Sequence, residues 1–451
     1  MANTFRSYQM DQPYLMPVSL RDWLPGDHLA LFVADVIGQL DLRPILRAYR
    51  GGRGPRGYHP QMLLTVLVYG YCIGVFSSRR LAAHCETDVA FRVLSGGDFP
   101  DFRTISDFRK RHLGVMRGLF IDVLGMCRES GLVRVGHVSL DGSKYQANAS
   151  KHKAMSYGRI GEAEPRLVAE IAALLEEAER IDREEDGTYG RDRRGDELPK
   201  ELQRREGRLE KIRAAKERLE ERARGRVRDR EEAKGATPQE IASAQAAARP
   251  ADREQSNFTD PESQIMKTRT GWVQGYNAQI VVEDASGVIL AEEVSAQAAD
   301  SPRLVPMIDQ MDANLTAIGV PMDERLSGVF SADAGYCSEA NLAALEERGI
   351  DAYVATGRER HHRGGVDPAG HPRTRRRAAM REKLRTESGR AIYARRKCIT
   401  EPVHGMIKQA RGFRQFLLRG RDKVGAEFTL VALGHNILKL WRAGVAPALA
   451  A

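Results

Sequence analysis

Apolar residues in the first third of the chain recur at the spacing of α-helices. Three helices are predicted there, at residues 29–40, 61–76 and 81–94. The second of these is apolar on nearly every side, which predicts a helix buried all round. Another helix is expected after residue 103, with Arg109, Lys110 and Arg111 facing outward. The pattern predicts an all-α N-terminal domain over residues 1–132. Its short helices with basic ends are typical of helix-turn-helix DNA binding, although a basic helical face is also common on ordinary protein surfaces.

Residues 151–256 carry a narrower apolar stripe in a highly charged background. Apolar positions alternate at spacings of four and three residues in two runs, at Leu167, Ile171, Leu174, Ala178 and Ile181, and then at Leu198, Leu202, Leu209, Ile212 and Leu219. Such a stripe is typical of paired helices. We favour an antiparallel helical hairpin within one chain, with an intermolecular coiled coil as the alternative. The composition after Glu232 predicts a flexible linker.

Residues 257–451 alternate between strand-like and helix-like patterns. Residues 277–283 and 288–294 predict a β-hairpin, because a short loop containing Gly287 joins them. Further strands are predicted at 328–332 and 350–355, with helices between them. A strand at 132–140 precedes the charged segment, so a mixed α/β fold is expected.

Charge and composition narrow the classes of partner. The chain has 70 Lys and Arg against 61 Asp and Glu, a net charge of +9, which favours a polyanionic partner such as DNA. The longest apolar run, residues 62–76, is shorter than the roughly 20 residues that span a bilayer, so no membrane association is expected. No secretory signal is apparent and the five cysteines form no Cys-x-x-Cys pair. We therefore expect a cytoplasmic protein.

Three acidic residues are candidates for metal binding or catalysis. Asp141 is predicted to end the strand at 132–140, and Asp333 follows the short strand at 328–332. Two such aspartates on neighbouring strands would suit a hard divalent cation. Glu401 precedes Pro402 at a predicted helix start, and Lys408 lies seven residues later on the same helical face. Taken singly, each acid is explained as a turn or cap residue. Together with Lys408, they suit metal-assisted phosphoryl transfer.

Several motifs together resemble the DDE transposases of bacterial insertion sequences, in the branch with a Tyr–Arg–Glu–Lys signature around the third acid. The matching segments are VSLDGSKYQAN (138–148), NFTDPESQIMKTRTGWVQGYNAQ (257–279), FSADAGY (330–336) and YARRKCITEPVHGMIKQARGFRQFLLRG (393–420), with further matches at 7–30 and 57–81. The resemblance implies a ribonuclease-H-like catalytic core. In this core the first acid lies on the first strand, the second follows the fourth strand, and the third lies on a later helix.

The resemblance also implies the roles of individual residues. It makes Asp141, Asp333 and Glu401 the catalytic acids that hold two Mg²⁺ ions, for which Mn²⁺ can substitute. Tyr393 and Lys408 match the tyrosine and lysine of the signature. The arginine has two candidates, because Arg396 has the expected spacing from the tyrosine and Lys397 has the expected spacing to the glutamate. On this view 133–150 holds the first strand, 151–256 is an insertion between the first and second strands, and 257–451 completes the core.

DNA contacts are expected from basic residues outside this signature. A segment between Ala355 and Tyr393 is rich in arginine, including Arg375, Arg376 and Arg377, and these are expected to contact phosphates together with Arg109 and Lys110. His361, His362 and His371 lie in the same segment, but their spacing matches no common metal site. Trp272 is a candidate for stacking on an unpaired base, with core packing as the alternative.

These features predict a transposase that binds the ends of its insertion sequence and catalyses metal-dependent strand cleavage and strand transfer. Its expected partners are double-stranded DNA, in the form of terminal inverted repeats and target DNA, and a second copy on paired ends. It would act in the cytoplasm, associated with the nucleoid. The alternative is a catalytically silent DNA-binding protein derived from a transposase. A helical scaffold would explain 151–256 but not the acidic motifs.

Overall fold

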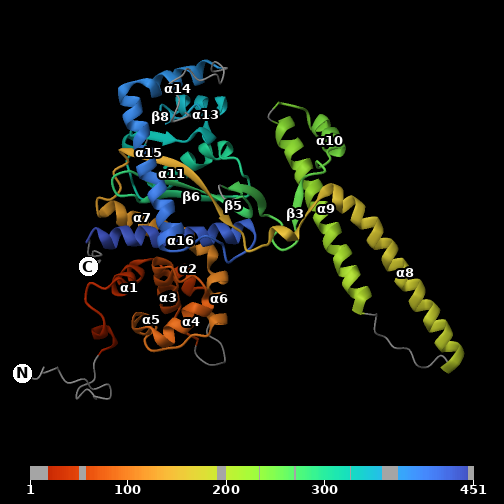
Figure 1. The fold of residues 1–451 in the computed structure, drawn as a ribbon. Helices are drawn as coiled ribbons and strands as arrows, with labels where there is room; N and C mark the ends of the chain where they lie inside the picture. Colours follow the sequence, from red (N-terminus) through yellow and green to blue (C-terminus); the bar gives the residue numbers. More distant parts are fainter. Residues whose placement is uncertain are drawn as a thin grey trace, which may run out of the picture.

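The structure, a computed structural model, has a helical N-terminal part, a mixed sheet flanked by helices, and a helical arm that projects from the sheet (Figure 1). It describes residues 19–49, 57–189, 200–232, 234–268, 271–325, 327–357 and 374–444. Within these ranges, side chains are described except at 177–189 and 200–202.

The N-terminal part is helical, as predicted. Its elements are η1 (Leu20–Trp23), α1 (Leu29–Gln39), α2 (Arg43–Leu46), α3 (Pro60–Ile73), α4 (Ser78–Thr87), α5 (Val89–Leu94), α6 (Phe102–Arg111), η2 (Leu113–Val115) and α7 (Met116–Glu129). Helix α3 is buried over nearly all its length and ends at Gly74, whose φ of 85° suits glycine. The single helix expected at 81–94 is instead two, because the Asp88 carboxylate accepts the Phe91 N–H and starts α5.

The main sheet has six strands, β1 (His137–Gln146), β4 (Gln264–Thr268), β5 (Gly271–Glu283), β6 (Ile289–Ser295), β7 (Val329–Ala332) and β8 (Asp351–Val354). β1 lies between β5, which is antiparallel to it, and β7, which is parallel to it. β8 adds to β7 in parallel, while β4 and β6 both pair antiparallel with β5. The predicted hairpin of β5 and β6 is confirmed.

β1 differs from the predicted strand in one important respect. It does not end at Asp141, because β5 continues to pair with it from Val138 opposite Glu283 to Gln146 opposite Gly275. The Asp-Gly dipeptide favours a turn locally, but pairing with β5 keeps it extended. Asp141 therefore lies within a strand that has a neighbour on each side.

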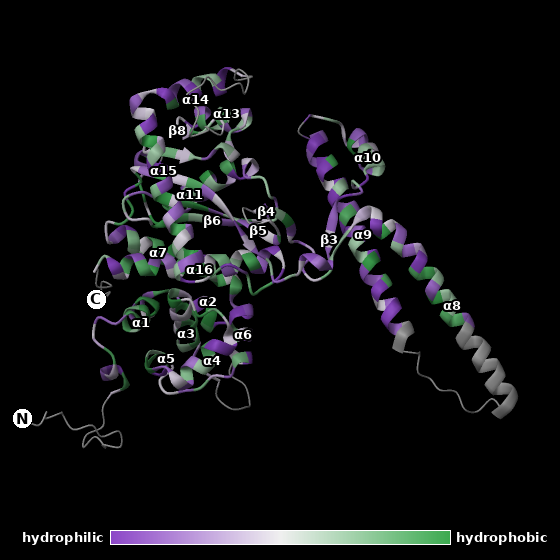
Figure 2. Ribbon diagram, viewed as in Figure 1, coloured by the Kyte–Doolittle hydropathy of each residue, from purple (hydrophilic) through white to green (hydrophobic). Residues whose placement is uncertain are grey.

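Helices pack around the sheet and join it to the N-terminal part. They are η4 (Ser301–Arg303), α11 (Leu304–Ala317), α12 (Met322–Arg325), η5 (Ala334–Tyr336), α13 (Glu339–Glu347), α14 (Arg375–Arg385), α15 (Glu387–Gly405), the π-helix η6 (Met406–Ala410) and α16 (Arg421–Arg442). α16 packs against β6 and also against α3 and α7. Its middle is buried, and one continuous hydrophobic core runs through these elements (Figure 2).

The insertion forms an antiparallel pair of long helices, α8 (Tyr157–Tyr189) and α9 (Lys200–Glu232), as favoured from the sequence. Lys216 pairs with Glu164 at 2.8 Å and Arg205 with Glu170 at 3.2 Å, so residue numbers rise along α8 as they fall along α9. A small apolar core, which includes Leu167 and Ile212, joins the two helices. At the root, β2 (Ala154–Ser156) pairs with β3 (Gln255–Asn257).

The linker predicted after Glu232 is wrong in part, because α10 (Pro238–Ala247) occupies much of it. Thr237 caps this helix through the Glu240 N–H, and the Glu240 carboxylate accepts the Thr237 N–H in return. The basic segment between Ala355 and Tyr393 is also partly helical, since α14 and the start of α15 lie in it.

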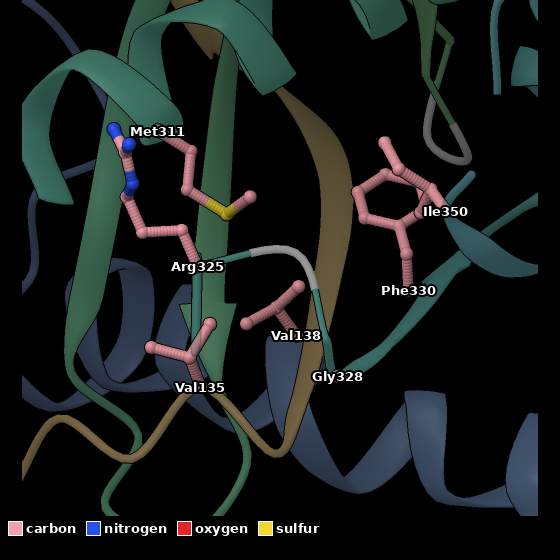
Figure 3. Close-up of a pocket in the computed structure, with 7 residues that line it drawn as sticks. All are labelled: Val135, Val138, Met311, Arg325, Gly328, Phe330 and Ile350. Atoms are coloured by element: carbon pink, nitrogen blue, oxygen red, sulfur yellow. The ribbon is translucent and has the colours of Figure 1, made fainter. Parts of the chain in front are cut away.

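An apolar pocket lies at the end of the sheet where the parallel strands begin (Figure 3). Its lining consists of Val135, Val138, Met311, Arg325, Gly328, Phe330 and Ile350. Ligand sites in open sheets with parallel strands lie at the opposite, carboxyl ends of the strands. The pocket also lacks acidic residues, so the candidate chemistry lies elsewhere.

No single helix in the described part of the chain is both long and apolar enough to span a membrane. The pair formed by α3 and α4 meets that test only when the two helices are taken together, and they are bent by 101°.

Candidate active site

The site is built around Asp141, in the middle of β1. Its Oδ1 accepts the Gly142 N–H at 2.8 Å, and its Oδ2 accepts the Thr400 hydroxyl at 3.3 Å. Arg396 Nη1 lies 3.5 Å from the same Oδ2. The strand holds the backbone and α15 supplies the contacts to the carboxylate, so the position of this acid is fixed from two elements.

The electrostatics of Asp141 reflect its surroundings. Burial raises the pKa of Asp141 to about 6, the Arg396 guanidinium opposes the rise, and the negative charge of Asp333 adds to it. A carboxylate with a raised pKa gains stability from any further cation that approaches it. The environment of Asp141 therefore favours a cation near this carboxylate.

Asp333 lies beside Asp141. In the parallel pairing of β1 with β7, Leu140 is opposite Ala332, so the two aspartates follow at the same level on neighbouring strands. The Asp333 carboxylate accepts the Gly335 N–H at 2.8 Å and starts the short helix η5. The sequence-predicted pair of acids is thus brought together at the carboxyl end of β7.

Glu401 is not gathered with the two aspartates. The expected helix start at this residue is wrong, because α15 begins at Glu387, capped by Thr386, and Pro402 lies inside the helix. Glu401 is exposed, one residue after Thr400, which touches Asp141. Within the residues that the structure describes, no three His, Cys, Asp or Glu side chains are close enough to hold a metal ion.

The two candidates for the arginine of the signature have different positions. Arg396 is buried on α15, faces Asp141, and lies with its guanidinium 5.7 Å from the centre of the Tyr393 ring. Lys397, the next residue, is exposed. Of these two residues, Arg396 is therefore the one that contacts Asp141.

Lys408 reaches β1 from the π-helix η6. Its ammonium group donates to Ser143 Oγ and, at 2.9 Å, to the Lys144 carbonyl, and it lies 4.3 Å from the centre of the Tyr145 ring. Burial lowers the pKa of Lys408 to about 8, and the charge of Lys144 contributes to the fall. The expected face shared by Glu401 and Lys408 does not persist, since the helix changes from α to π between them.

Sequence reasoning missed Asp300, whose carboxylate lies beside Gly142 and the side chain of Gln279. An aspartate before Ser301 and Pro302 is expected to cap a helix. Its carboxylate makes no such cap contact, and instead binds Lys144, Asn277 and Gln279 on the sheet. Local sequence gives no signal for this arrangement, because all three partners lie on other elements.

The residues expected to contact DNA fall into different environments. The prediction that Arg109 faces outward is wrong, because its guanidinium is buried and donates to the Tyr71 hydroxyl at 3.3 Å and to the Phe76 carbonyl at 3.1 Å. Glu427 is the nearby buried anion that favours this placement. Lys110 is exposed and lies 3.6 Å from Asp107.

The three consecutive arginines begin α14. Arg375 is exposed, Arg376 pairs with Glu339 and Glu346 at 3.1 and 2.7 Å, and Arg377 donates to the Cys337 carbonyl at 3.2 Å. Residues 358–373, with His361, His362, His371 and the neighbouring arginines, lie outside the described residues. Trp272, the candidate for base stacking, is 58% exposed and pairs with Lys267 across β4 and β5, so it is not a core residue.

Two family models match the chain. A "Transposase DDE domain" matches residues 237–437, which include Asp333 and Glu401 but neither Asp141 nor most of the arm. A "Transposase domain (DUF772)" matches residues 18–111, in the N-terminal helical part. No match to the chain is found among curated proteins or among solved structures.

Proposed function

Because the chain belongs to the insertion-sequence DDE transposases, we propose that it binds the ends of its own element and cuts and rejoins DNA there. One observation carries the proposal. Asp141 and Asp333 lie side by side on neighbouring parallel strands, with Arg396 against Asp141. Paired carboxylates with an adjacent cation suit the transfer of a phosphoryl group between oxygens.

The arrangement of strands supports a ribonuclease-H-like core. β1, β5 and β6 are antiparallel neighbours in sequence order, while β7 and β8 extend the other edge in parallel. Counted without the additional strand β4, Asp141 lies on the first strand and Asp333 follows the fourth. These are the positions that the family resemblance assigns to the first two acids.

Carboxylate oxygens are the ligands that Mg²⁺ and Mn²⁺ prefer, so the chemistry of the paired aspartates suits such ions. We propose that Asp141 and Asp333 hold them, with Glu401 as the third ligand by resemblance. When bound, the ions would neutralise charge on the scissile phosphate and activate the attacking water or 3′-hydroxyl. The raised pKa of Asp141 fits a carboxylate that gains from a nearby cation.

The basic residues around the pair would bind the DNA backbone. Arg396 and Lys408 would hold strand phosphates beside the acids, with Tyr393 packing on Arg396. Lys397 and the exposed Arg375 are further candidates, followed by Arg376 and Arg377 once their present partners are exchanged for phosphates. Lys110, which lies in the N-terminal part, would contact the ends of the element. Pairing of two ends would require a second copy of the protein.

Substitution of the acids tests the proposal directly. Asp141→Asn and Asp333→Asn should reduce Mg²⁺-dependent cleavage of end-containing DNA to background while leaving end binding intact. Asp309→Asn is a matched control, because Asp309 pairs with Arg348 on an exposed part of α11. Full cleavage by either active-site variant would refute the assignment.

The exposed position of Glu401 favours one alternative, a catalytically silent DNA-binding protein. Such a protein would bind end-containing DNA with the same affinity in the presence and absence of Mg²⁺ or Mn²⁺. It would nick none of the DNA at any metal concentration. The same assay on the unsubstituted chain therefore separates the two functions.

A further inference from the structure

Asp300 is a third carboxylate close to the aspartate pair, and no part of the proposed function uses it. It directly precedes η4 and α11, on a loop that returns from β6. Its side chain is 19% exposed and makes no contact with the helix start that follows it. A capping role, the ordinary reason for an aspartate before Ser-Pro, therefore does not explain this residue.

The Asp300 carboxylate is bound by donors from two strands. Oδ1 accepts Asn277 Nδ2 at 2.7 Å and Gln279 Nε2 at 2.9 Å, both from β5. Lys144, from β1, places its ammonium group 3.4 Å from the same oxygen. Because a carboxylate held by several donors has little freedom to rotate, these contacts fix the orientation of Asp300.

The network continues to the segment that carries Asp333. The Gln279 amide donates to Asp300, and its carbonyl oxygen accepts the Tyr336 hydroxyl. Tyr336 is fully buried and lies in η5, the short helix that Asp333 starts. Asp300, Gln279 and Tyr336 thus connect the turn at Asp333 to the middle of the sheet.

Two glycines allow this close packing. A Cβ at Gly335 would lie 2.9 Å from Asp333 Oδ1 and 3.1 Å from Asp300 Oδ2, so both carboxylates contact the same point of η5. A Cβ at Gly142, the residue after Asp141, would lie 2.3 Å from Gln279 Nε2 and 2.7 Å from Asp300 Oδ1. Asp300 therefore packs against the residue next to Asp141 and against the turn formed by Asp333.

We propose that Asp300 is a positioning residue, which acts with Gln279 and Tyr336 to hold Asp141 and Asp333 beside each other for cation binding. This inference rests on the proposed function. In this role Asp300 acts through Asp141 and Asp333 and is not itself a ligand of the ion, and its Oδ1 is held by the Asn277 and Gln279 amides and Lys144. Its contribution is to accept hydrogen bonds, which an asparagine oxygen can also do.

Mn²⁺ binding to the full-length protein, measured by titration calorimetry without DNA, tests the role. Asp300→Ala should weaken Mn²⁺ binding about tenfold or more, as loss of a residue that orients metal ligands commonly does. Asp300→Asn should retain affinity to within about threefold, because the two amides keep an acceptor. Binding of end-containing DNA should be unchanged in both variants, and Asp309→Asn should bind Mn²⁺ like the unsubstituted protein.

The outcomes separate the possible roles of Asp300. Unchanged Mn²⁺ affinity in Asp300→Ala would overturn the proposal. Equal loss in Asp300→Asn and Asp300→Ala would also overturn it, because the negative charge itself would then be required, as for a direct ligand. If Asp300→Ala fails to fold, Tyr336→Phe removes only the hydroxyl that binds Gln279, and it should weaken Mn²⁺ binding several-fold; no change would count against the network.

The proposed function can fail separately from this inference. If the unsubstituted protein binds Mn²⁺ and cleaves DNA while Asp300→Ala matches it in both, only the positioning role is wrong. If the unsubstituted protein neither binds Mn²⁺ nor cleaves end-containing DNA, the proposed function is wrong and the positioning role is lost with it.

Discussion

The guanidinium of Arg396 lies 3.5 Å from the carboxylate of Asp141, and both groups are largely shielded from water. The pair joins α15 to β1 at the candidate active site. Because the two charges are this close, removing the charge of Arg396 changes the pKa of Asp141.

Arg396→Gln should raise the pKa of Asp141 above its value of about 6, because the cation that opposes the effect of burial is removed. A higher pKa means that protons compete with the metal up to a higher pH. We expect the acid limb of the cleavage–pH profile, measured with Mn²⁺, to move to higher pH. Lys397→Ala, one residue away and exposed, should leave that limb in place. An unshifted profile in Arg396→Gln would show that the two charges are not linked.

Lys110 and Arg109 should respond differently to substitution although they are adjacent. Lys110→Ala should reduce the slope of log affinity against log salt by about 0.9, the value for one lost phosphate contact on B-DNA. Arg109→Ala should instead lower the free energy of unfolding by about 3 kcal/mol, because it leaves Glu427 buried without its cation. Salt-dependent fluorescence anisotropy and thermal unfolding measure the two effects. The reverse pattern would contradict the placement of Arg109.

Glu292 should make the protein less stable at alkaline pH than at pH 5. Burial raises the pKa of Glu292 to about 8, although the Thr429 hydroxyl, 2.6 Å away, opposes the rise. The folded state keeps a proton that the unfolded state releases above pH 4.5. The stabilisation is therefore fully present below pH 4.5. It falls by about 1.4 kcal/mol per pH unit as the pH rises from 4.5 to 8, and it is lost above pH 8.

Glu292→Gln should abolish this dependence, so that the variant unfolds at a higher temperature than the original protein at pH 9 and at a similar temperature at pH 5. The exposed residue Glu347 offers a matched control, Glu347→Gln, which should not alter the dependence on pH. Parallel losses of stability in Glu292→Gln and the original protein between pH 5 and pH 9 would show that Glu292 is not the group responsible.

Elements with a strong local pattern were predictable from sequence. The apolar run at 61–76 gives α3, and the alternation around Gly287 gives the hairpin of β5 and β6. Asp141 and Asp333 were also identified, because each follows a short apolar strand pattern. Their proximity depends on the parallel pairing of β1 with β7, which no local pattern contains.

The errors share a physical cause, which is that a distant element decides the local outcome. Asp141 and Gly142 favour a turn by themselves, and only β5 keeps them extended. Arg109 belongs to a basic run that suggests a solvent-facing surface, yet its buried partner Glu427 lies on the last helix. Asp300 resembles a helix cap in sequence, while its donors lie on two strands.

The packing of α16 against α3 and α7 has a consequence for biosynthesis. The ribosome releases the apolar helices of the N-terminal part long before it releases α16, which covers them. Exposed apolar surface on a nascent chain promotes aggregation, so we expect the N-terminal part to complete its folding only when α16 packs against it. Translation that stops before α16 should therefore give an insoluble fragment rather than a folded N-terminal part.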